Sequence, residues 1–238
     1  MAHLSAVINS TIRALVQELD VFKDVSDAAL SDILTQARPR RVVAGSSVFT
    51  QGAPALSFFL LLEGQLKIVQ TSREGEQIIA HWVAPGQLFG FAIALGLHAY
   101  PGTAQAVTDS IALAWPMRAW DVLVQRHPAV TTTALRTVGG HLQDAFARLR
   151  DVSAAQVEQR IARALLRIMR QSGLRTEGGV QIDFPVTRRD IAEMTSTTLY
   201  TVSRTLSAWE QAGVLTGGRR RRIVVLDPHA LVRLAGSE

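Results

Sequence analysis

Residues 186–215 read VTRRDIAEMTSTTLYTVSRTLSAWEQAGVL, and this stretch decides the fold. Thr187 and Asp190 have the spacing of a capping box, which predicts a short helix that begins directly after Thr187. The polar residues 195–198 interrupt that helix. Residues 199–211 then repeat their apolar side chains at helical spacing, which predicts a second helix. Two short helices joined by a tight turn are typical of a helix-turn-helix.

The residues that follow add a wing to this motif. Residues 213–226 predict two short strands around a turn of four consecutive arginines. A helical hairpin that only packs a core is the alternative, but it does not explain why Tyr200, Ser203 and Arg204 occupy the exposed face of the second helix. The combination predicts a winged helix that binds DNA.

The docking geometry of such motifs assigns a role to each polar residue. The start of the second helix enters the major groove, where Arg204 can donate two hydrogen bonds to guanine O6 and N7. Tyr200 and Ser203 share its face and can contact base edges, whereas threonines at the helix starts and the arginine turn are placed for phosphates. The residues expected to contact DNA are Thr187, Arg188, Thr198, Tyr200, Thr201, Ser203, Arg204, Arg219, Arg220, Arg221 and Arg222.

Composition supports a DNA partner and excludes several protein classes. The chain has 238 residues, 47% hydrophobic and 19% charged, which is enough for one large or two ordinary domains. Residues 151–238 carry 13 basic and 9 acidic side chains, a net charge of +4, which favours a polyanionic partner. The absence of cysteine excludes disulfides and iron–sulfur clusters held by thiolates. The longest apolar run, Leu88–Leu97, is too short to cross a membrane, so we expect a soluble cytoplasmic protein.

Three kinds of sequence pattern follow one another along the chain: short helical, then β-strand, then helical again. This order predicts an α+β architecture. Short apolar runs between glycine-containing turns indicate a small antiparallel β-roll before the helical part, and Ser26 is the expected N-cap of a helix that precedes the roll. The expected domains are a sensor roll with N-terminal helices over 1–116, a dimerisation helix over 117–153, and the winged helix-turn-helix over 154–238.

The predicted long helix carries a narrow apolar stripe. Its residues alternate spacings of three and four, as in the seam of a coiled coil. The alternative is that this face packs on the chain's own roll. A stripe this narrow favours a homodimer, because the apolar face of a helix in a globular core is wider. The expected seam residues are Leu135, Val138, Leu142, Ala145, Leu149 and Val152.

The order of roll, long helix and winged helix resembles the Crp/Fnr family of bacterial transcription regulators over essentially the full chain. The resemblance is carried by FFLLLEGQLKIV at 58–69, EGEQ at 74–77, PGQLFG at 85–90 and the helix-turn-helix stretch. It implies a cyclic-nucleotide-binding-type roll, a homodimer on palindromic promoter DNA, and an activator that recruits RNA polymerase. It also implies that Arg204 reads guanine. Tyr200 stands where the family usually has glutamate, and Ser196 where it has the turn glycine.

The effector site departs from this family pattern. Cyclic-nucleotide binders carry Gly-Glu where this chain reads Gly90-Phe91, and Arg-Ser near Tyr100-Pro101-Gly102. No lysine or arginine lies between Arg73 and Arg118, and a buried phosphate without a cation is strongly disfavoured. We therefore do not expect cyclic AMP to bind. The residues expected to line an apolar effector pocket are Leu88, Phe89, Phe91, Ile93, Leu95, Leu97, His98 and Tyr100.

This apolar pocket and TTLYTVSRTLSAWE at 197–210 resemble the NnrR-like regulators, which respond to nitric oxide and control denitrification genes. That resemblance implies haem as a candidate cofactor, with His98 as the axial metal ligand and His81 or His141 as weaker candidates. The alternative is that His98 lies on a surface loop and the apolar run is roll core. A regulator without a ligand and a binding module that controls a partner protein also stay open. An enzyme is not expected, because the common nucleotide-binding, serine-nucleophile and zinc-protease motifs are absent.

Overall fold

The computed structural model describes residues 12–14, 16, 17, 19, 22, 25–92, 96–217 and 222–236. The chain divides into two compact units, and strands β4 and β5 and helix α4 contribute residues to both. The first unit comprises Met1–Ile68 and His81–His141, and the second comprises Val69–Ala80 and Leu142–Glu238. No helix among the described residues is long and apolar enough to cross a membrane.

Helix α2 (Asp27–Thr35) precedes the roll and begins where the sequence predicts. The Ser26 hydroxyl accepts a hydrogen bond from the Ala29 amide, which satisfies one free donor of the first turn. The Trp115 indole nitrogen donates to the Ile33 carbonyl at 2.8 Å and so fastens α2 to the roll. Most of the residues before Ser26, where the sequence predicts a further N-terminal helix, lie outside the described residues.

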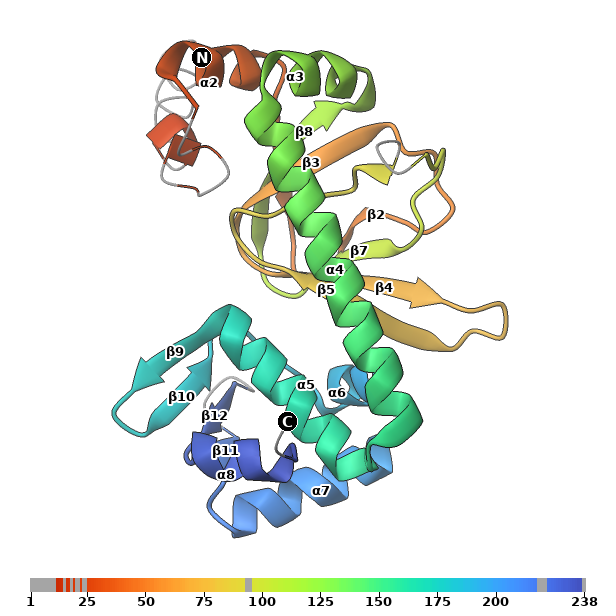
Figure 1. Cartoon of the computed structure of the whole chain (residues 1–238), viewed down its shortest axis with the longest axis vertical. Coiled ribbons are helices and arrows are strands. Elements are labelled where there is room, and N and C mark those ends of the chain that lie inside the picture. The colour runs from red at the N-terminus through yellow and green to blue at the C-terminus, as the bar shows by residue number, and fades with distance from the viewer. Residues whose placement is uncertain are drawn as a thin grey trace. The chain divides into compact units, whose positions relative to one another are not determined.

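The predicted antiparallel roll is confirmed as two four-stranded sheets, with strand orders β1-β8-β3-β6 and β2-β7-β4-β5 (Figure 1). The strands are β1 (Arg38–Val42), β2 (Ser47–Phe49), β3 (Ser57–Glu63), β4 (Leu66–Thr71), β5 (Gln77–Val83), β6 (Leu88–Phe89), β7 (Thr103–Ala106) and β8 (Ser110–Pro116). Gly64 turns the chain from β3 into β4 with a φ of 91°. A Cβ there would lie 2.6 Å from the Asp109 carbonyl oxygen, so this turn requires glycine.

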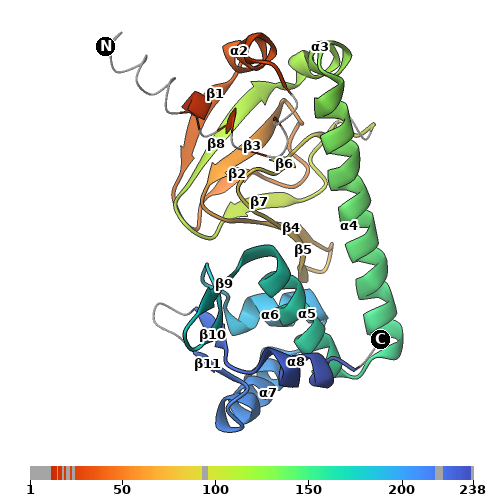
Figure 2. The same ribbon diagram turned by 60° about the vertical axis from the view of Figure 1, so that its left-hand side comes forward.

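A break that the sequence analysis did not predict divides the helical part after the roll. The 3-10 turn η3 (Met117–Ala119) leads into α3 (Trp120–Arg126), and α4 (Pro128–Ala154) follows as one helix of 27 residues (Figure 2). His127 has φ −130° and ψ 80°, outside the helical region. Pro128 explains the break, because the residue before a proline is disfavoured in helical geometry while proline itself fits the first helical position.

The second unit contains the predicted winged helix. Its elements are α5 (Val157–Ser172), β9 (Gly173–Thr176), β10 (Gly179–Ile182), α6 (Arg188–Thr195), α7 (Leu199–Gln211), β11 (Leu215–Gly217), β12 (Ile223–Val225) and α8 (Pro228–Leu234). The two wing strands pair with the β9–β10 hairpin in one sheet of order β11-β12-β10-β9. Helix α8, which the sequence analysis missed, begins at Asp227, whose carboxylate accepts from the Ala230 amide at 2.8 Å.

A buried carboxylate joins the end of α4 to the DNA-binding part. Asp151 accepts hydrogen bonds from the guanidinium groups of Arg163 at 2.7 Å and Arg167 at 2.8 Å, both on α5. The Nε of Arg163 also donates to the Ala235 carbonyl at 2.8 Å, so the network reaches the end of α8. Burial alone would raise the pKa of Asp151, but the two arginines outweigh it and lower the pKa below its ordinary value.

Replacing this carboxylate is expected to destabilise the second unit in a pH-dependent way. Because the folded-state pKa is lowered, the stabilisation is fully present above the unfolded-state value and is lost as the pH falls through the folded-state value. Asp151→Asn should cost about 3 kcal/mol at neutral pH, since it leaves two partly buried guanidinium groups without their partner. Urea unfolding should show that the free energies of unfolding of the original protein and of Asp151→Asn become equal below about pH 4.

The matched control for this test is Glu177→Gln, which removes an exposed carboxylate in the turn between β9 and β10. It should leave the urea midpoint of unfolding unchanged both at neutral pH and below about pH 4. Equal midpoints for Asp151→Asn and the original protein at neutral pH would show that the network does not stabilise the fold.

Candidate nucleic-acid interface

The start of helix α6 has the predicted capping box. The Thr187 hydroxyl accepts from the Asp190 amide at 3.1 Å, and the Asp190 carboxylate accepts from the Thr187 amide at 2.8 Å. The Thr187 hydroxyl also donates to that carboxylate at 2.6 Å. Both donors of Thr187 are therefore occupied within the cap. Its hydroxyl is engaged in the cap, and its predicted contact with a DNA phosphate stays a prediction.

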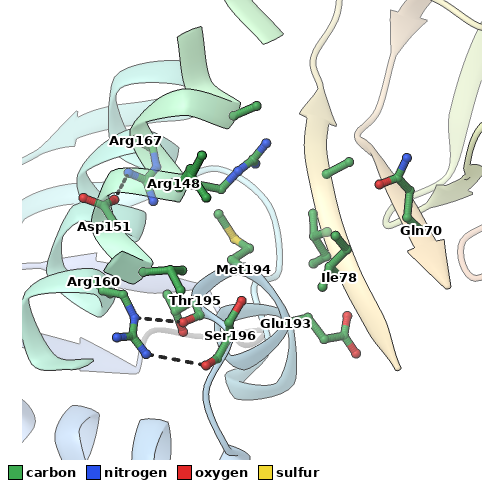
Figure 3. A pocket seen from close by; sticks show the side chains of 15 residues that line it. Gln70, Ile78, Arg148, Asp151, Arg160, Arg167, Glu193, Met194, Thr195 and Ser196 are labelled. Atoms are coloured by element: carbon green, nitrogen blue, oxygen red, sulfur yellow. Dashed lines mark hydrogen bonds and ion pairs between the residues drawn. The ribbon is translucent and has the colours of Figure 1, made fainter. Parts of the chain in front are cut away.

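The turn between the two helices depends on Ser196 and on an arginine that the sequence analysis missed. Ser196 caps α6 in the left-handed conformation with φ 48°, and among the described residues it is the only non-glycine with positive φ. Arg160 of α5 donates from Nε to the Thr195 carbonyl at 3.1 Å and from Nη2 to the Ser196 carbonyl at 3.5 Å (Figure 3). A cation at these last carbonyls of α6 also complements the helix dipole. Arg160 thus holds the turn that orients α7.

Helix α7 presents the predicted polar face. Its N-cap Thr198 accepts from the Thr201 amide at 3.1 Å, and the hydroxyl oxygens of these two threonines lie 2.9 Å apart. Tyr200 is 75% exposed, and Arg204 is exposed. Neither side chain has a hydrogen bond or ion pair to any residue that the structure describes. Ser203 lies half-exposed beside them, so these three side chains form an outward face while the opposite face is buried.

The remaining arginines expected at DNA differ in their environment. Arg188 lies 3.5 Å from the Glu210 carboxylate, and Arg222 donates to the Asp183 carboxylate at 3.1 Å. Exposed pairs of this kind contribute little free energy, so phosphates can replace the carboxylates at small cost. Arg219, Arg220 and Arg221 lie outside the described residues.

The side chains predicted to line an effector pocket form part of the roll's aromatic core. Tyr100 stacks on Phe49 with ring centroids 3.8 Å apart, and its hydroxyl donates to the Ser57 carbonyl at 2.7 Å. Phe89 stacks on Phe59 at 5.1 Å. Leu88 and Phe91 are buried with them, and Phe91 stacks on Trp120 with ring centroids 6.0 Å apart. These four side chains pack as core, which apolar residues at this spacing do equally well, and an effector pocket lined by them stays a prediction.

The histidines are placed differently from the sequence expectation. His98 is exposed and Leu97 is 41% exposed, whereas Ile93 and Leu95 lie outside the described residues. Among the described residues, no three histidine or acidic side chains come together as metal ligands.

The two weaker candidates, His81 of β5 and His141 of α4, stack on each other with ring centroids 3.7 Å apart. The structure therefore brings together the two histidines that the sequence analysis favoured less.

The predicted seam of α4 is exposed in the single chain. Leu135 is 67% exposed, Leu142 54% and Leu149 63%, so much of the stripe is uncovered in the single chain. Val152 and Ala145 are also exposed, and Val138 is half-buried. The stripe includes Phe146, 57% exposed, which the analysis missed because it lies beside the strict spacing of three and four.

Comparisons with known families cover both parts of the chain. The Crp-like helix-turn-helix domain matches residues 159–234, and the cyclic nucleotide-binding domain matches residues 39–127. The transcriptional activator protein FnrA of Stutzerimonas stutzeri is 26% identical over 208 residues, 87% of this chain and 84% of the relative. The fumarate and nitrate reduction regulatory protein of Escherichia coli is 25% identical over 207 residues, 87% of this chain and 81% of that protein.

Solved structures show the same arrangement of elements. FixK2 of Bradyrhizobium japonicum aligns with a TM-score of 0.74 at 22% identity, covering 85% of this chain and 98% of that one. A CRP-family transcriptional regulator of Thermus thermophilus aligns with a TM-score of 0.70 at 28% identity, covering 83% and 97%.

Substitutions on the two kinds of basic residue should separate base reading from phosphate binding. Arg204→Ala should cost about 1–3 kcal/mol on the specific site and relax discrimination at one guanine of each half-site. Neutralising Arg220 and Arg221 should instead weaken specific and random DNA alike and flatten the salt dependence. Fluorescence anisotropy with both DNAs at several salt concentrations measures this, and identical losses of specificity in the two variants would refute the division.

Proposed function

The chain belongs to the Crp/Fnr family of transcription regulators, and on that premise we propose that it acts as a homodimer on palindromic promoter sites of genes for anaerobic or nitrogen-oxide metabolism. The helix-turn-helix part accounts for binding to DNA. The proposed gene class draws on relatives named as a fumarate and nitrate reduction regulatory protein and as an anaerobic regulatory protein. Recruitment of RNA polymerase is part of the same proposal.

The observation that carries this proposal is the outward face of α7. Tyr200 and Arg204 are exposed and make no hydrogen bond or ion pair within the described chain, on a helix whose start is capped and whose other face is buried. A binding module that only controls a partner protein has no need for an unpaired arginine at this position of a winged helix. A sequence-specific DNA reader does need one.

The exposed stripe of α4 supports the dimer. Large apolar side chains at coiled-coil spacing have a strong driving force to be covered, and a second copy of the same helix matches them by symmetry. A two-fold arrangement also places two recognition helices on half-sites about one DNA turn apart. Palindromic DNA follows from that symmetry.

Charges in this stripe should produce monomers. Leu142→Glu together with Leu149→Glu would place two carboxylates of each chain, four in all, in the dimer seam. These charges would repel one another and would lose their hydration if the seam closed. Light scattering should show half the molecular mass, and affinity for a palindromic site should fall steeply. Gln143→Glu, an exposed change beside the stripe, is the control and should keep the dimer. An unchanged mass for the double variant would contradict the seam.

For the roll, we propose control by an effector other than cyclic AMP, with an NnrR-like response to nitric oxide as the specific hypothesis. Phe91 follows Gly90 where a cyclic-nucleotide site needs a carboxylate, and the roll has no cation between Arg73 and Arg118. A Cβ at Gly90 would lie 2.9 Å from the rings of both Phe49 and Phe59, so the interior is tightly packed there. This packing favours a regulator without any ligand in the roll as the second candidate.

Haem stays a prediction that the described residues do not support. His98, its expected axial ligand, is exposed, and the aromatic side chains expected to enclose the group pack on one another. The described residues therefore do not fit a haem at His98, and no step of the proposed function depends on one.

Two measurements on the purified protein check the effector proposals. Cyclic AMP should give no binding heat in calorimetry and no change in DNA affinity, because no lysine or arginine lies between Arg73 and Arg118, where cyclic-nucleotide binders carry the arginine that holds the phosphate. Because the described residues do not fit a haem at His98, His98→Ala should leave unchanged any Soret band of protein from haem-supplemented cells, including its shift with nitric oxide. A clear heat of binding with cyclic AMP would contradict the first expectation, and a Soret band altered by His98→Ala would contradict the second.

A further inference from the structure

The second unit contains a cavity of about 330 Å³. Its walls are strands β4 and β5 near Gln70 and Ile78, the last turns of α4, α5, and the end of α6 (Figure 3). Most of the lining is apolar, with Ile78, Ile79 and Met194 among its members. A volume of this size suits a small organic molecule.

One arginine in this cavity forms no hydrogen bond or ion pair with a described residue. This residue, Arg148 of α4, is half-buried and lines the cavity. Burial, with the nearby charge of Arg167 as the second cause, lowers the pKa of Arg148 below its ordinary value, and the charge of Asp144, one turn earlier on α4, acts in the opposite direction. An arginine keeps its charge under these conditions, so a partly desolvated cation has near it only an exposed carboxylate with which it forms no ion pair.

The other charged residues of the cavity are already engaged. Arg167 donates to Asp151 at 2.8 Å, and Asp151 is shared with Arg163. Arg160 donates to the carbonyls at the end of α6, and Glu193 lies 3.7 Å from the Nε of Arg189. The carboxylates that line the cavity thus have arginine partners of their own, and Asp144 is exposed and does not line the cavity. The N–H donors of Arg148 are therefore left for an anion that enters the cavity from outside.

We propose that this cavity binds a small organic oxyanion whose apolar group lies against Ile78, Ile79 and Met194 while its carboxylate or phosphate pairs with Arg148. A guanidinium group presents parallel N–H donors that match the two oxygens of such an anion. The apolar walls require an apolar body, because inorganic anions would leave them in contact with water.

The position of this site gives binding a regulatory consequence, and that consequence alone rests on the proposed function. Met194 and Ser196 at the end of α6 border the cavity and belong to the turn that orients α7. Leu149 and Val152 line the cavity and belong to the proposed dimer seam. A ligand that prefers one arrangement of these elements shifts DNA affinity by its difference in affinity for the two arrangements.

Calorimetry on the full-length protein without DNA tests the site, with phenyl phosphate and phenylacetate as probes and benzyl alcohol as the uncharged comparison. At least one anion should bind and the alcohol should not. Arg148→Gln should weaken anion binding by about tenfold or more, which corresponds to loss of one charge-assisted ion pair. Arg150→Gln, an exposed arginine two residues along the same helix, is the matched control and should bind like the original protein.

A second variant keeps the test decisive if Arg148→Gln does not fold. Ile78→Asp places a carboxylate on a wall residue that is 46% exposed, where it would pair with Arg148 and exclude the probe. Three results would overturn the proposal: no binding of either anion, equal binding by Arg148→Gln, or binding of the alcohol as tight as that of the anions. Because no DNA is present in this experiment, a lack of anion binding would not affect the proposed function. Conversely, a lack of DNA binding would not change the heats of anion binding.

Discussion

An apolar stripe on a helix of 27 residues is the constraint from which the rest of the arrangement follows. Leu135, Leu142, Leu149 and Phe146 are each more than half exposed in the single chain. Burying one such side chain contributes about 1.5–3 kcal/mol, so covering several together favours the proposed association of two chains against its loss of entropy. In the proposed homodimer, two-fold symmetry would set the spacing of the recognition helices, and through it the symmetry of the DNA that fits them.

Polar contacts, rather than apolar area, connect this helix to the recognition helix. Asp151 joins α4 to two arginines of α5, and Arg160 of the same α5 holds the carbonyls at the turn before α7. Hydrogen bonds to charged groups have defined directions, whereas apolar contacts allow sliding. Because Arg160, Arg163 and Arg167 all belong to α5, a displacement at the end of α4 would be passed to the turn if α5 moves as a rigid body. Such a path provides the geometry that effector control of DNA binding requires.

The sequence predicted those features whose signals are local. The capping box at Thr187, the turn at Ser196 and the buried face of α7 each depend on a few neighbouring residues. The ion pairs of Asp151 and the role of Arg160 join residues from 12 to 36 positions apart, and nothing in their local sequence indicates a partner. The packing of Phe89 and Tyr100 as core could not be read from the sequence for another reason, since an apolar run shows that side chains avoid water but not whether a ligand or other side chains cover them.

The distribution of charge bears on where an effector could act. The roll has no lysine or arginine between Arg73 and Arg118, and aromatic rings pack in its interior. The cavity at the end of α4 and along α5, by contrast, is lined by Arg148, whose N–H donors are not engaged by any described residue. If this chain responds to an anionic metabolite, electrostatics favours the second unit over the roll. A signal received there would act directly on the turn before α7, without first passing along the length of α4.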